Sequence, residues 1–343
     1  MSLTDGYEFV ELPPGAVQVH RARRGSAVFH RRVEGSYSGS LVVRFSCEQL
    51  VHIGTGYKQL LSLAAGAPAR IVREGARVMG RPGIPGSSLK GALRSRFEAI
   101  TRSCIQGRPP ERSAVRSQST DIRRAELSTA VLNQDVLQAC RVNRKEPLQS
   151  ELCPACALFG LMSLRGRITC TDLMTPQGTE FTHVDVPEPF GPNLHHVGEV
   201  TRTQDGEGKP CFLVRRLHGR KFAMGRGPVP PRPNLQPVEA IPSGCILDGS
   251  LLLTNVTLSE LGGVLAALGH LPESPLKIGG ARGQGLGRLQ LANLQFDLEA
   301  PDGTKLAKPA EALHQEFLRS QDVWPAGLDK LVRVHLAERG ASP

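Results

Sequence analysis

The sequence predicts an α+β fold: a ferredoxin-like or RRM-like βαββαβ unit that carries large loop insertions. Strand-like and helical segments follow in the order strand, helix, interrupted middle, strand, helix, Gly-rich loop and strand, which is the order of that unit. The 37 Gly and 26 Pro among 343 residues favour strands joined by many loops over a helical bundle. A chain of this length can also bury a sizeable core.

Two segments predict the first half of the unit. Residues 41–47 carry apolar side chains near period two and predict a strand. Residues 88–104 predict a helix with Ser87 or Ser88 as its N-cap. The apolar residues of this helix fall on one stripe: Leu89, Ala92, Leu93, Phe97 and Ile100. Its basic residues fall off that stripe: Lys90, Arg94 and Arg96.

Three segments predict the second half. Residues 245–256 read as a strand, and residues 286–298 as the final strand. Between them, residues 259–270 have apolar positions at helical spacing. Thr257 or Ser259 is expected to cap this helix.

The chain divides into an arm, one elaborated domain and a tail. Residues 1–39 are rich in Arg, Gly and Pro and predict an N-terminal arm. Residues 40–298 form the RRM-like domain, with insertions at about 105–157 and 183–244, where the chain is polar, charged and rich in Pro. Residues 299–343 predict a tail that is helical in part.

Composition favours a polyanionic partner. With 42 Lys and Arg against 32 Asp and Glu, the formal net charge is +10, which suits nucleic acid or an anionic surface. No apolar run approaches the ~20 residues of a spanning helix, and no signal peptide is recognisable, so we expect a soluble cytoplasmic protein with no membrane partner. Aromatic residues are only 4% of the chain, so any RNA contact should use the phosphate backbone rather than base stacking.

Residues 84–97, IPGSSLKGALRSRF, predict an anion site. A Pro-Gly turn leads two hydroxyls and Lys90 into a helix start, where free N–H groups and the helix dipole favour a phosphate. The spacing differs from that of a Walker A loop, which disfavours a nucleotide hydrolase. The alternative is an ordinary capped helix.

Residues 277–288, KIGGARGQGLGR, form a second candidate anion site. Glycine allows close approach of a ligand to the backbone, and successive amides can form a nest, with Arg282 and Arg288 adding charge. The loop precedes a strand rather than opening a helix, which differs from a dinucleotide-binding site. The alternative is a tight turn required only for packing.

Four cysteines predict a structural zinc site. Cys153 and Cys156 have the spacing of a metal knuckle, Cys140 lies shortly upstream, and Cys104 lies at the end of the first helix. Four thiolates suit tetrahedral zinc, which would attach the Arg-rich insertion to the domain. Cys170 or a histidine could replace one ligand, and a tight turn packed by apolar side chains could explain the CPAC segment without metal.

These motifs, together with His52-Ile-Gly-Thr-Gly56 after the first strand, resemble the RAMP superfamily. The similarity comprises an HIGxG-like turn, the IPGSSLKGxLRS helix and a GGxRxxGxG loop. Three further segments resemble backbone subunits of type III CRISPR effector complexes: YEFVELP at 7–13, CPACALFG at 153–160 and HGRKF at 218–222. The matches thus extend from near the N-terminus to about residue 290.

The resemblance implies a subunit of an antiviral ribonucleoprotein with a palm that binds guide (CRISPR) RNA. It also implies a thumb-like hairpin, for which residues 183–232 are the candidate, stacking with other RAMP subunits, target RNA paired to the guide, and zinc beside the CPxCxLFG segment. The residues that match RNA-contacting motifs are His52, Gly54, Gly56, Gly86, Ser87, Ser88, Lys90, Arg94, Gly279, Gly280, Arg282, Gly283, Gln284 and Gly285.

The resemblance argues against catalysis at the usual place. Family members that cut target RNA use an aspartate in the loop between the HIGxG and IPGSSLKG motifs, and residues 57–83 contain none. Glu74 is the only carboxylate there and reads as a surface partner of Arg73; Asp172 and Asp185 read as solvated carboxylates. The alternatives are a RAMP-type endoribonuclease that cuts target RNA or processes repeat RNA through a histidine, and an adaptor that binds only protein. The histidines considered are His52, His195, His196 and His218.

Overall fold

The computed structural model describes most of the chain. The described residues are 7–12, 19–24, 27–62, 66, 68–105, 140–143, 145–146, 149–187, 198–204, 210–223, 235–272 and 274–338. Only the backbone is described in 198–204, 210–217 and 335–338. Much of the insertion at 105–157, parts of the candidate thumb, and His195 and His196 therefore lie outside the described residues.

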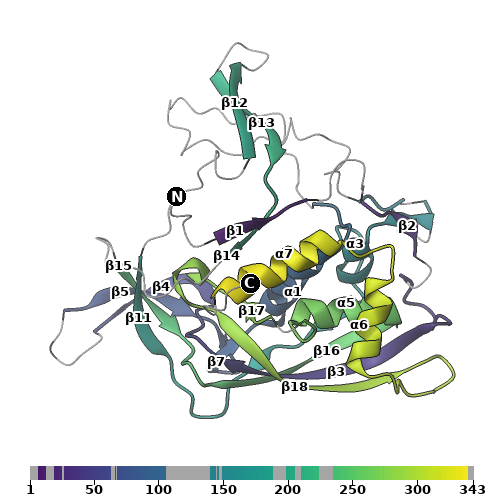
Figure 1. Ribbon diagram of the computed structural model, residues 1–343. Coiled ribbons are helices and arrows are strands. Elements are labelled where there is room, and N and C mark those ends of the chain that lie inside the picture. Colours follow the sequence, from purple (N-terminus) through teal and green to yellow (C-terminus); the bar gives the residue numbers. More distant parts are fainter. Residues whose placement is uncertain are drawn as a thin grey trace.

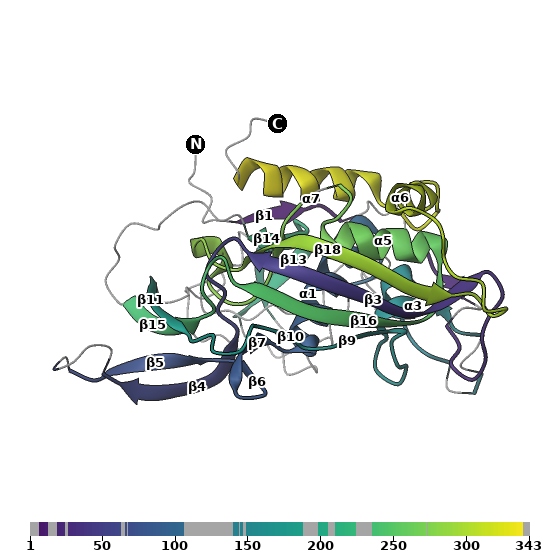
Figure 2. The same cartoon turned by 90° about the horizontal axis from the view of Figure 1, so that it is seen from below.

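The centre of the molecule is an antiparallel sheet (Figure 2). Its long strands are β3 (Ser36–Cys47), β16 (Ile246–Thr257) and β18 (Arg288–Glu299), and β3 pairs with both of the others. The short strands β9 (Ile168–Cys170) and β10 (Leu173–Met174) pair with the other edge of β16. The order β18, β3, β16, then β9 and β10 is the ferredoxin-like order 4-1-3-2, so the predicted α+β class is confirmed.

Two helices cover one face of this sheet: α1 (Gly86–Ile100) and α5 (Leu258–Leu268) (Figure 1). Strand β3 alternates, with Leu41, Val43 and Phe45 fully buried and the side chains between them directed to the open face. Because one face of the sheet is apolar and the other polar, the register of the three long strands is strongly specified.

The helix starts partly confirm the sequence analysis. Thr257 caps α5 in a capping box with Glu260, as predicted. The N-cap of α1 is Pro85 without a side-chain hydrogen bond, so the prediction of Ser87 or Ser88 as cap is wrong. The helix begins two residues earlier than predicted because its first amide finds an acceptor on another segment, Asp172.

Residues 299–338 add two helices to the covered face. Helix α6 (Ala310–Leu318) packs on α5, and α7 (Pro325–Glu338) packs on α1. The strand β1 (Tyr7–Val10) pairs with β14 (Arg220–Ala223) beside α7 (Figure 1). A second apolar cluster joins these elements through Val10, Ile100, Phe222, Phe317 and Leu331.

The ferredoxin-like sheet and the two helices that cover it form the palm. A second, four-stranded sheet projects from it (Figure 2). Its order is β11 (Thr182–Pro187), β15 (Leu235–Ala240), β5 (Arg70–Gly75) and β4 (Gly54–Leu61). Much of residues 57–83, treated above as a loop, thus forms strands.

The remaining elements are short. Strands β6 (Arg77–Val78) and β7 (Arg81–Ile84) extend the palm sheet at one edge, and β17 (Leu276–Lys277) at the other. Strand β2 (Ala22–Arg23) pairs with β8 (Glu151–Leu152), just before helix α3 (Pro154–Phe159). Strands β12 (Gly198–Gln204) and β13 (Pro210–Leu217) form an antiparallel hairpin, and residues Arg282–Gln284 form a turn of 3₁₀ helix.

Candidate metal centre and nucleic-acid interface

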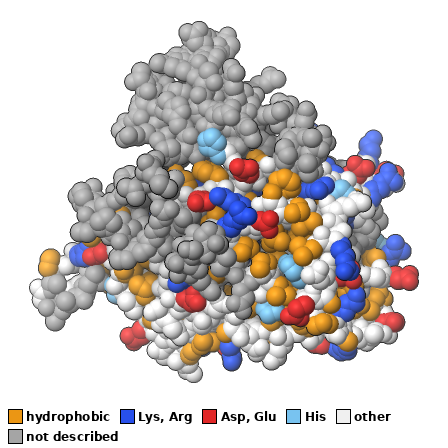
Figure 3. All heavy atoms as spheres, in the orientation of Figure 1, with side chains coloured by type: hydrophobic (Ala, Val, Ile, Leu, Met, Phe, Trp, Pro, Cys, Tyr) orange, Lys and Arg blue, Asp and Glu red, His pale blue; other side chains and the backbone are white. Residues whose placement is uncertain are grey.

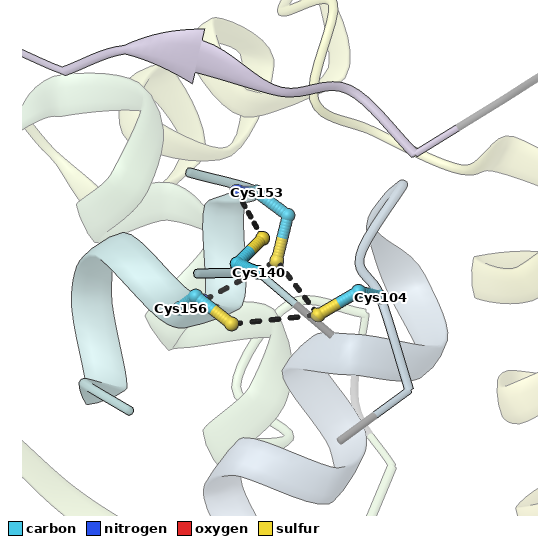
Figure 4. A group of neighbouring side chains, drawn as sticks. All are labelled: Cys104, Cys140, Cys153 and Cys156. Atoms are coloured by element: carbon cyan, nitrogen blue, oxygen red, sulfur yellow. Dashed lines mark hydrogen bonds between the residues drawn. The ribbon is translucent and has the colours of Figure 1, made fainter. Parts of the chain in front are cut away.

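Four buried cysteines lie close together beside the C-terminal end of α1 (Figure 4). Their sulfur atoms all lie within 4.8 Å of one another. The Sγ of Cys104 lies 3.4 Å from that of Cys156 and 3.6 Å from that of Cys153. Four sulfurs at ~2.3 Å from one tetrahedral ion lie about 3.8 Å apart, so this arrangement can hold a metal ion.

The local structure explains how the sequence assembles this cluster. Cys153 is the N-cap of α3 and places Cys156 one turn further on, where the amide of Cys156 donates to the Sγ of Cys153 at 3.5 Å. The amide of Cys153 donates to the Sγ of Cys140 at 3.2 Å. The predicted ligands Cys104, Cys140, Cys153 and Cys156 are therefore brought together, and Cys170 is not among them.

The thiols of this cluster share protons unequally. Hydrogen bonds from Cys104 lower the pKa of the Cys140 thiol, and they lower the pKa of the Cys153 thiol to about 7. Hydrogen bonding with neighbouring sulfurs raises the pKa of Cys104 and of Cys156. A bound cation would favour thiolates at all four positions, because metal ligation requires deprotonated sulfur.

Two arginines flank the cluster. Arg94 of α1 donates from Nε to Glu98 at 2.8 Å, from Nη1 to the carbonyl of Gly160 at 2.8 Å and from Nη2 to the Sγ of Cys156 at 3.8 Å. Arg220 of β14 donates to the other oxygen of Glu98 at 2.6 Å and to the carbonyl of Cys104 at 3.0 Å. The structure thus places Arg94, a predicted RNA contact, at the cysteine cluster.

The start of α1 differs from an open anion site. The amide of Gly86 donates to Oδ1 of the exposed Asp172 at 2.7 Å, so a carboxylate of the protein already occupies one donor. A Cβ at Gly86 would lie 2.1 Å from the carbonyl of Cys170, so the glycine is required by close packing. Ser87 is exposed and Ser88 is half-buried. Burial lowers the pKa of Lys90, which is also half-buried.

The Gly-rich loop packs directly on the HIGTG turn. The amide of Gly280 donates to the carbonyl of His52 at 2.8 Å, and a Cβ at Gly279 would lie 2.3 Å from that oxygen. His52 is buried and its Nδ1 lies 2.7 Å from the carbonyl of Glu239. Close packing thus explains the glycines at 279 and 280 in the Gly-rich loop, whereas Gly54 and Gly56 of the HIGTG turn are exposed.

The Gly-rich loop also reaches α1 at a small pocket. The pocket is lined by Ala92, Ser95, Arg96, Phe222, Ala223, Lys277 and Arg282. Arg282 is exposed, whereas Gly283, Gln284 and Gly285 beside it are half-buried, with Gly285 at φ +86°. Lys277 is buried and donates from Nζ to the carbonyl of Arg282 at 3.2 Å, so the exposed Arg282 is the cation of this hollow that is placed to contact an anion.

Arg96 corrects the predicted helix stripe. Its side chain is buried, and it donates to the carbonyls of Pro275 at 3.0 Å and Ser274 at 3.3 Å. Burial lowers its pKa to about 9. The prediction that it lies off the buried side of α1 is wrong because these carbonyls satisfy the guanidinium inside the protein.

The open face of the palm sheet is poorly suited to stacking bases. At its centre Arg44 is ion-paired with Asp248 at 2.6 Å, and Val42 and Leu252 are exposed. Phe45 of β3 is buried on the opposite face. A stacking surface needs exposed rings, which this part of the sheet lacks in the described residues.

The outer surface carries mixed charge. In the face shown in Figure 3, basic and acidic side chains alternate over the described residues, with apolar side chains between them. None of the helices in the described part combines the length and apolar composition needed to cross a membrane.

Sequence reasoning missed several residues of these sites. Arg220 and Lys277 stood within recognised segments but were given no role, and Asp172 was treated only as a solvated carboxylate. Arg167, fully buried and ion-paired with Glu260, had no signal in a single sequence. Each depends on contacts between segments distant in the chain, except Lys277, whose position beside the Gly-rich loop could have indicated the pocket.

Comparison with known proteins agrees with this architecture. The fold and sites define an α+β protein whose ferredoxin-like palm is built around glycine-rich and cysteine-rich segments. Residues 44–290 match the RAMP superfamily, and the chain belongs to that superfamily. It is thus a CRISPR-associated RAMP protein, and membership implies in general the binding of CRISPR RNA and of other Cas subunits. A search of curated proteins gave no match.

Proposed function

We propose that this chain is a structural subunit of a type III CRISPR effector ribonucleoprotein that grips the backbone of the guide RNA. It stacks with similar RAMP subunits, presents the guide to target RNA and so serves antiviral defence. Family membership supports the RNA partner. The type of complex rests on the resemblance of the 7–13, 153–160 and 218–222 segments to type III backbone subunits.

The observation that carries this proposal is the meeting of α1 and the Gly-rich loop at one basic pocket. Arg282 is exposed at its edge, whereas Arg96 and Lys277 are buried beneath it on carbonyls of the protein and add positive charge. Phosphate oxygens are bound by such groups without regard to base identity. Since the open sheet face offers no ring for stacking among the described residues, backbone contact is the mode that fits best.

The proposed subunit holds RNA without cutting it. The segment that carries the cleaving aspartate in related nucleases has a single carboxylate here, that of Glu74, and Glu74 is half-buried in β5. Asp185 is ion-paired with Arg70 at 2.8 Å, and Asp172 accepts the Gly86 amide. These contacts give both aspartates structural roles.

We also propose that the cysteine cluster holds structural zinc. Four thiolates and no position for a water ligand are typical of a structural rather than catalytic zinc site. The bound ion would attach Cys140, within the insertion, to the end of α1 and to α3.

The test is to purify the tagged protein from its native host and sequence the RNA that remains bound. Enrichment of CRISPR guide RNA is expected; a random RNA population or none would refute the proposal. Incubation of the pure protein with labelled repeat and target RNA, with and without divalent metal, provides the second measurement. Defined cleavage products would instead favour the endoribonuclease.

A further inference from the structure

We propose that Arg94 and Arg220 are positioning residues that couple the cysteine cluster to strand β14, and through it to the base of the β12–β13 hairpin. Both arginines act through one carboxylate, Glu98. The inference rests on the proposed metal site and adds a role for it: the ion holds in place a hairpin that is remote from it in the chain.

On the metal side, the link is Arg94. Its guanidinium contacts the Sγ of Cys156 at 3.8 Å and the carbonyl of Gly160, which ends α3. A metal-bound thiolate accepts a stronger, charge-assisted hydrogen bond than a neutral thiol does. Metal binding should therefore strengthen the hydrogen bond between Arg94 and the Sγ of Cys156.

Glu98 links Arg94 to Arg220 of β14. One of its oxygens accepts from Arg94 and the other from Arg220, and the two arginines and the glutamate are all largely buried, with 11 to 22% of each side chain exposed. Ion pairs at such burial keep a defined geometry more readily than exposed ones do. Arg220 also donates to the carbonyls of Ser103 at 3.2 Å and Cys104 at 3.0 Å, next to the metal ligand itself.

On the hairpin side, a short connection joins β13 to Arg220. Strand β13 ends at Leu217 and β14 begins at Arg220. Gly219 between them has φ +151°, and a Cβ there would lie 2.2 Å from the carbonyl of Val10. The orientation of Arg220 thus restrains the last residues of the hairpin, since a two-residue connection cannot absorb a shift of β14.

The first test is metal-dependent hydrogen exchange of the full chain. In the wild type, removal of zinc by a chelator should speed amide exchange in 210–223 by about tenfold. In Arg220→Gln the same amides should exchange rapidly while zinc is still bound, and chelation should add little. Arg70→Gln, which breaks an exposed ion pair with Asp185, is the matched control and should keep the wild-type metal dependence.

A second test reads the cluster itself. Cobalt(II) bound in place of zinc gives a sulfur-to-metal charge-transfer band that responds to hydrogen bonds on the thiolates. Arg94→Met should shift this band, and Arg94→Lys should partly restore it. A purely structural role of Arg94 would leave the band unchanged.

The outcomes separate the two proposals. If neither zinc nor cobalt binds, the metal site fails and the coupling fails with it. If metal binds but exchange in 210–223 is the same with and without it, or Arg220→Gln keeps the full metal dependence, only the coupling is wrong. The comparison of Arg220→Gln with the wild type while zinc is bound does not depend on the metal-free protein remaining folded.

Discussion

At the scale of single residues, Arg282 offers the most direct test of RNA binding. It is exposed beside the pocket that joins the Gly-rich loop to α1. We expect Arg282→Gln to weaken binding of all RNA sequences about equally and to lower the slope of log affinity against log salt by about one, because one phosphate contact is lost. Filter binding at several salt concentrations measures both quantities.

The control for Arg282 is Arg44→Gln. Arg44 is also exposed, but it is ion-paired with Asp248 on the open sheet face. Its loss should leave the salt slope unchanged. A loss of affinity confined to particular base sequences in Arg282→Gln would contradict backbone recognition.

The buried pair Arg167 and Glu260 sets a second prediction. Burial opposes ionisation of Glu260, but the charge and hydrogen bonds of Arg167 outweigh it and lower its pKa from 4.5. Because the pKa of Glu260 is lower in the folded than in the unfolded protein, its ionisation stabilises the fold at any pH above the unfolded-state pKa. This stabilisation is lost as the pH falls through the folded-state pKa. Glu260→Gln should lower the free energy of unfolding at pH 7 by about 3 to 5 kcal/mol, because Arg167 remains buried without its counter-charge.

Urea unfolding between pH 7 and pH 3 measures this effect. The wild type should lose stability on acidification more steeply than Glu260→Gln does. Glu299→Gln removes an exposed partner of Arg32 and should change stability by less than about 1 kcal/mol. Equal losses in the two variants would show that burial of the Arg167 pair carries no special weight.

At the scale of elements, two helical glycines distinguish propensity from packing. Gly91 of α1 is exposed, and a Cβ there would meet nothing within 4 Å. Gly262 of α5 is buried, and a Cβ there would lie 2.0 Å from the carbonyl of Leu313 in α6. Gly91→Ala should stabilise the protein by roughly 0.5 to 1 kcal/mol, whereas Gly262→Ala should destabilise it by separating α5 from α6.

Thermal unfolding of the two variants provides the measurement. The two shifts in Tm should have opposite signs, although the same methyl group is added to a helix in each. Stabilisation by Gly262→Ala would mean that α6 does not pack on α5 as described.

Across the whole molecule, the cysteine cluster joins distant parts of the chain. Cys104 follows α1, and Cys140 is the first described residue after the stretch 106–139, which lies outside the described residues. Loss of the ion should leave the palm folded on its own apolar core but release the insertion. Removal of roughly 3 kcal/mol of stability would lower Tm by about 4 °C.

Calorimetry with and without a chelator tests this prediction. Cys140→Ser should lower Tm by a similar amount and make it insensitive to the chelator. Cys47→Ser is the matched control, since Cys47 is a buried cysteine outside the cluster, and its Tm should still respond to chelation.

The sequence by itself determined the elements whose patterns are local. Period-two alternation identified β3, helical spacing identified α1 and α5, and Thr257 was one of the two caps predicted for α5. The sequence also singled out the four cysteines that the structure brings together, although Cys104 and Cys140 lie outside the local CPAC segment. The strand and helix predictions share one physical cause: the spacing of apolar residues along the chain reflects which side of an element faces the core.

Only the tertiary structure decided the features that depend on contacts between distant segments. The Gly86 amide is satisfied by Asp172, Arg96 is buried against carbonyls of another loop, and Arg94 contacts Cys156 of the cysteine cluster. No periodicity encodes such pairings, because a polar group can be satisfied by any correctly placed acceptor once the chain has folded. Whether a given arginine faces RNA or supports a metal site is therefore decided by packing, not by the motif in which it lies.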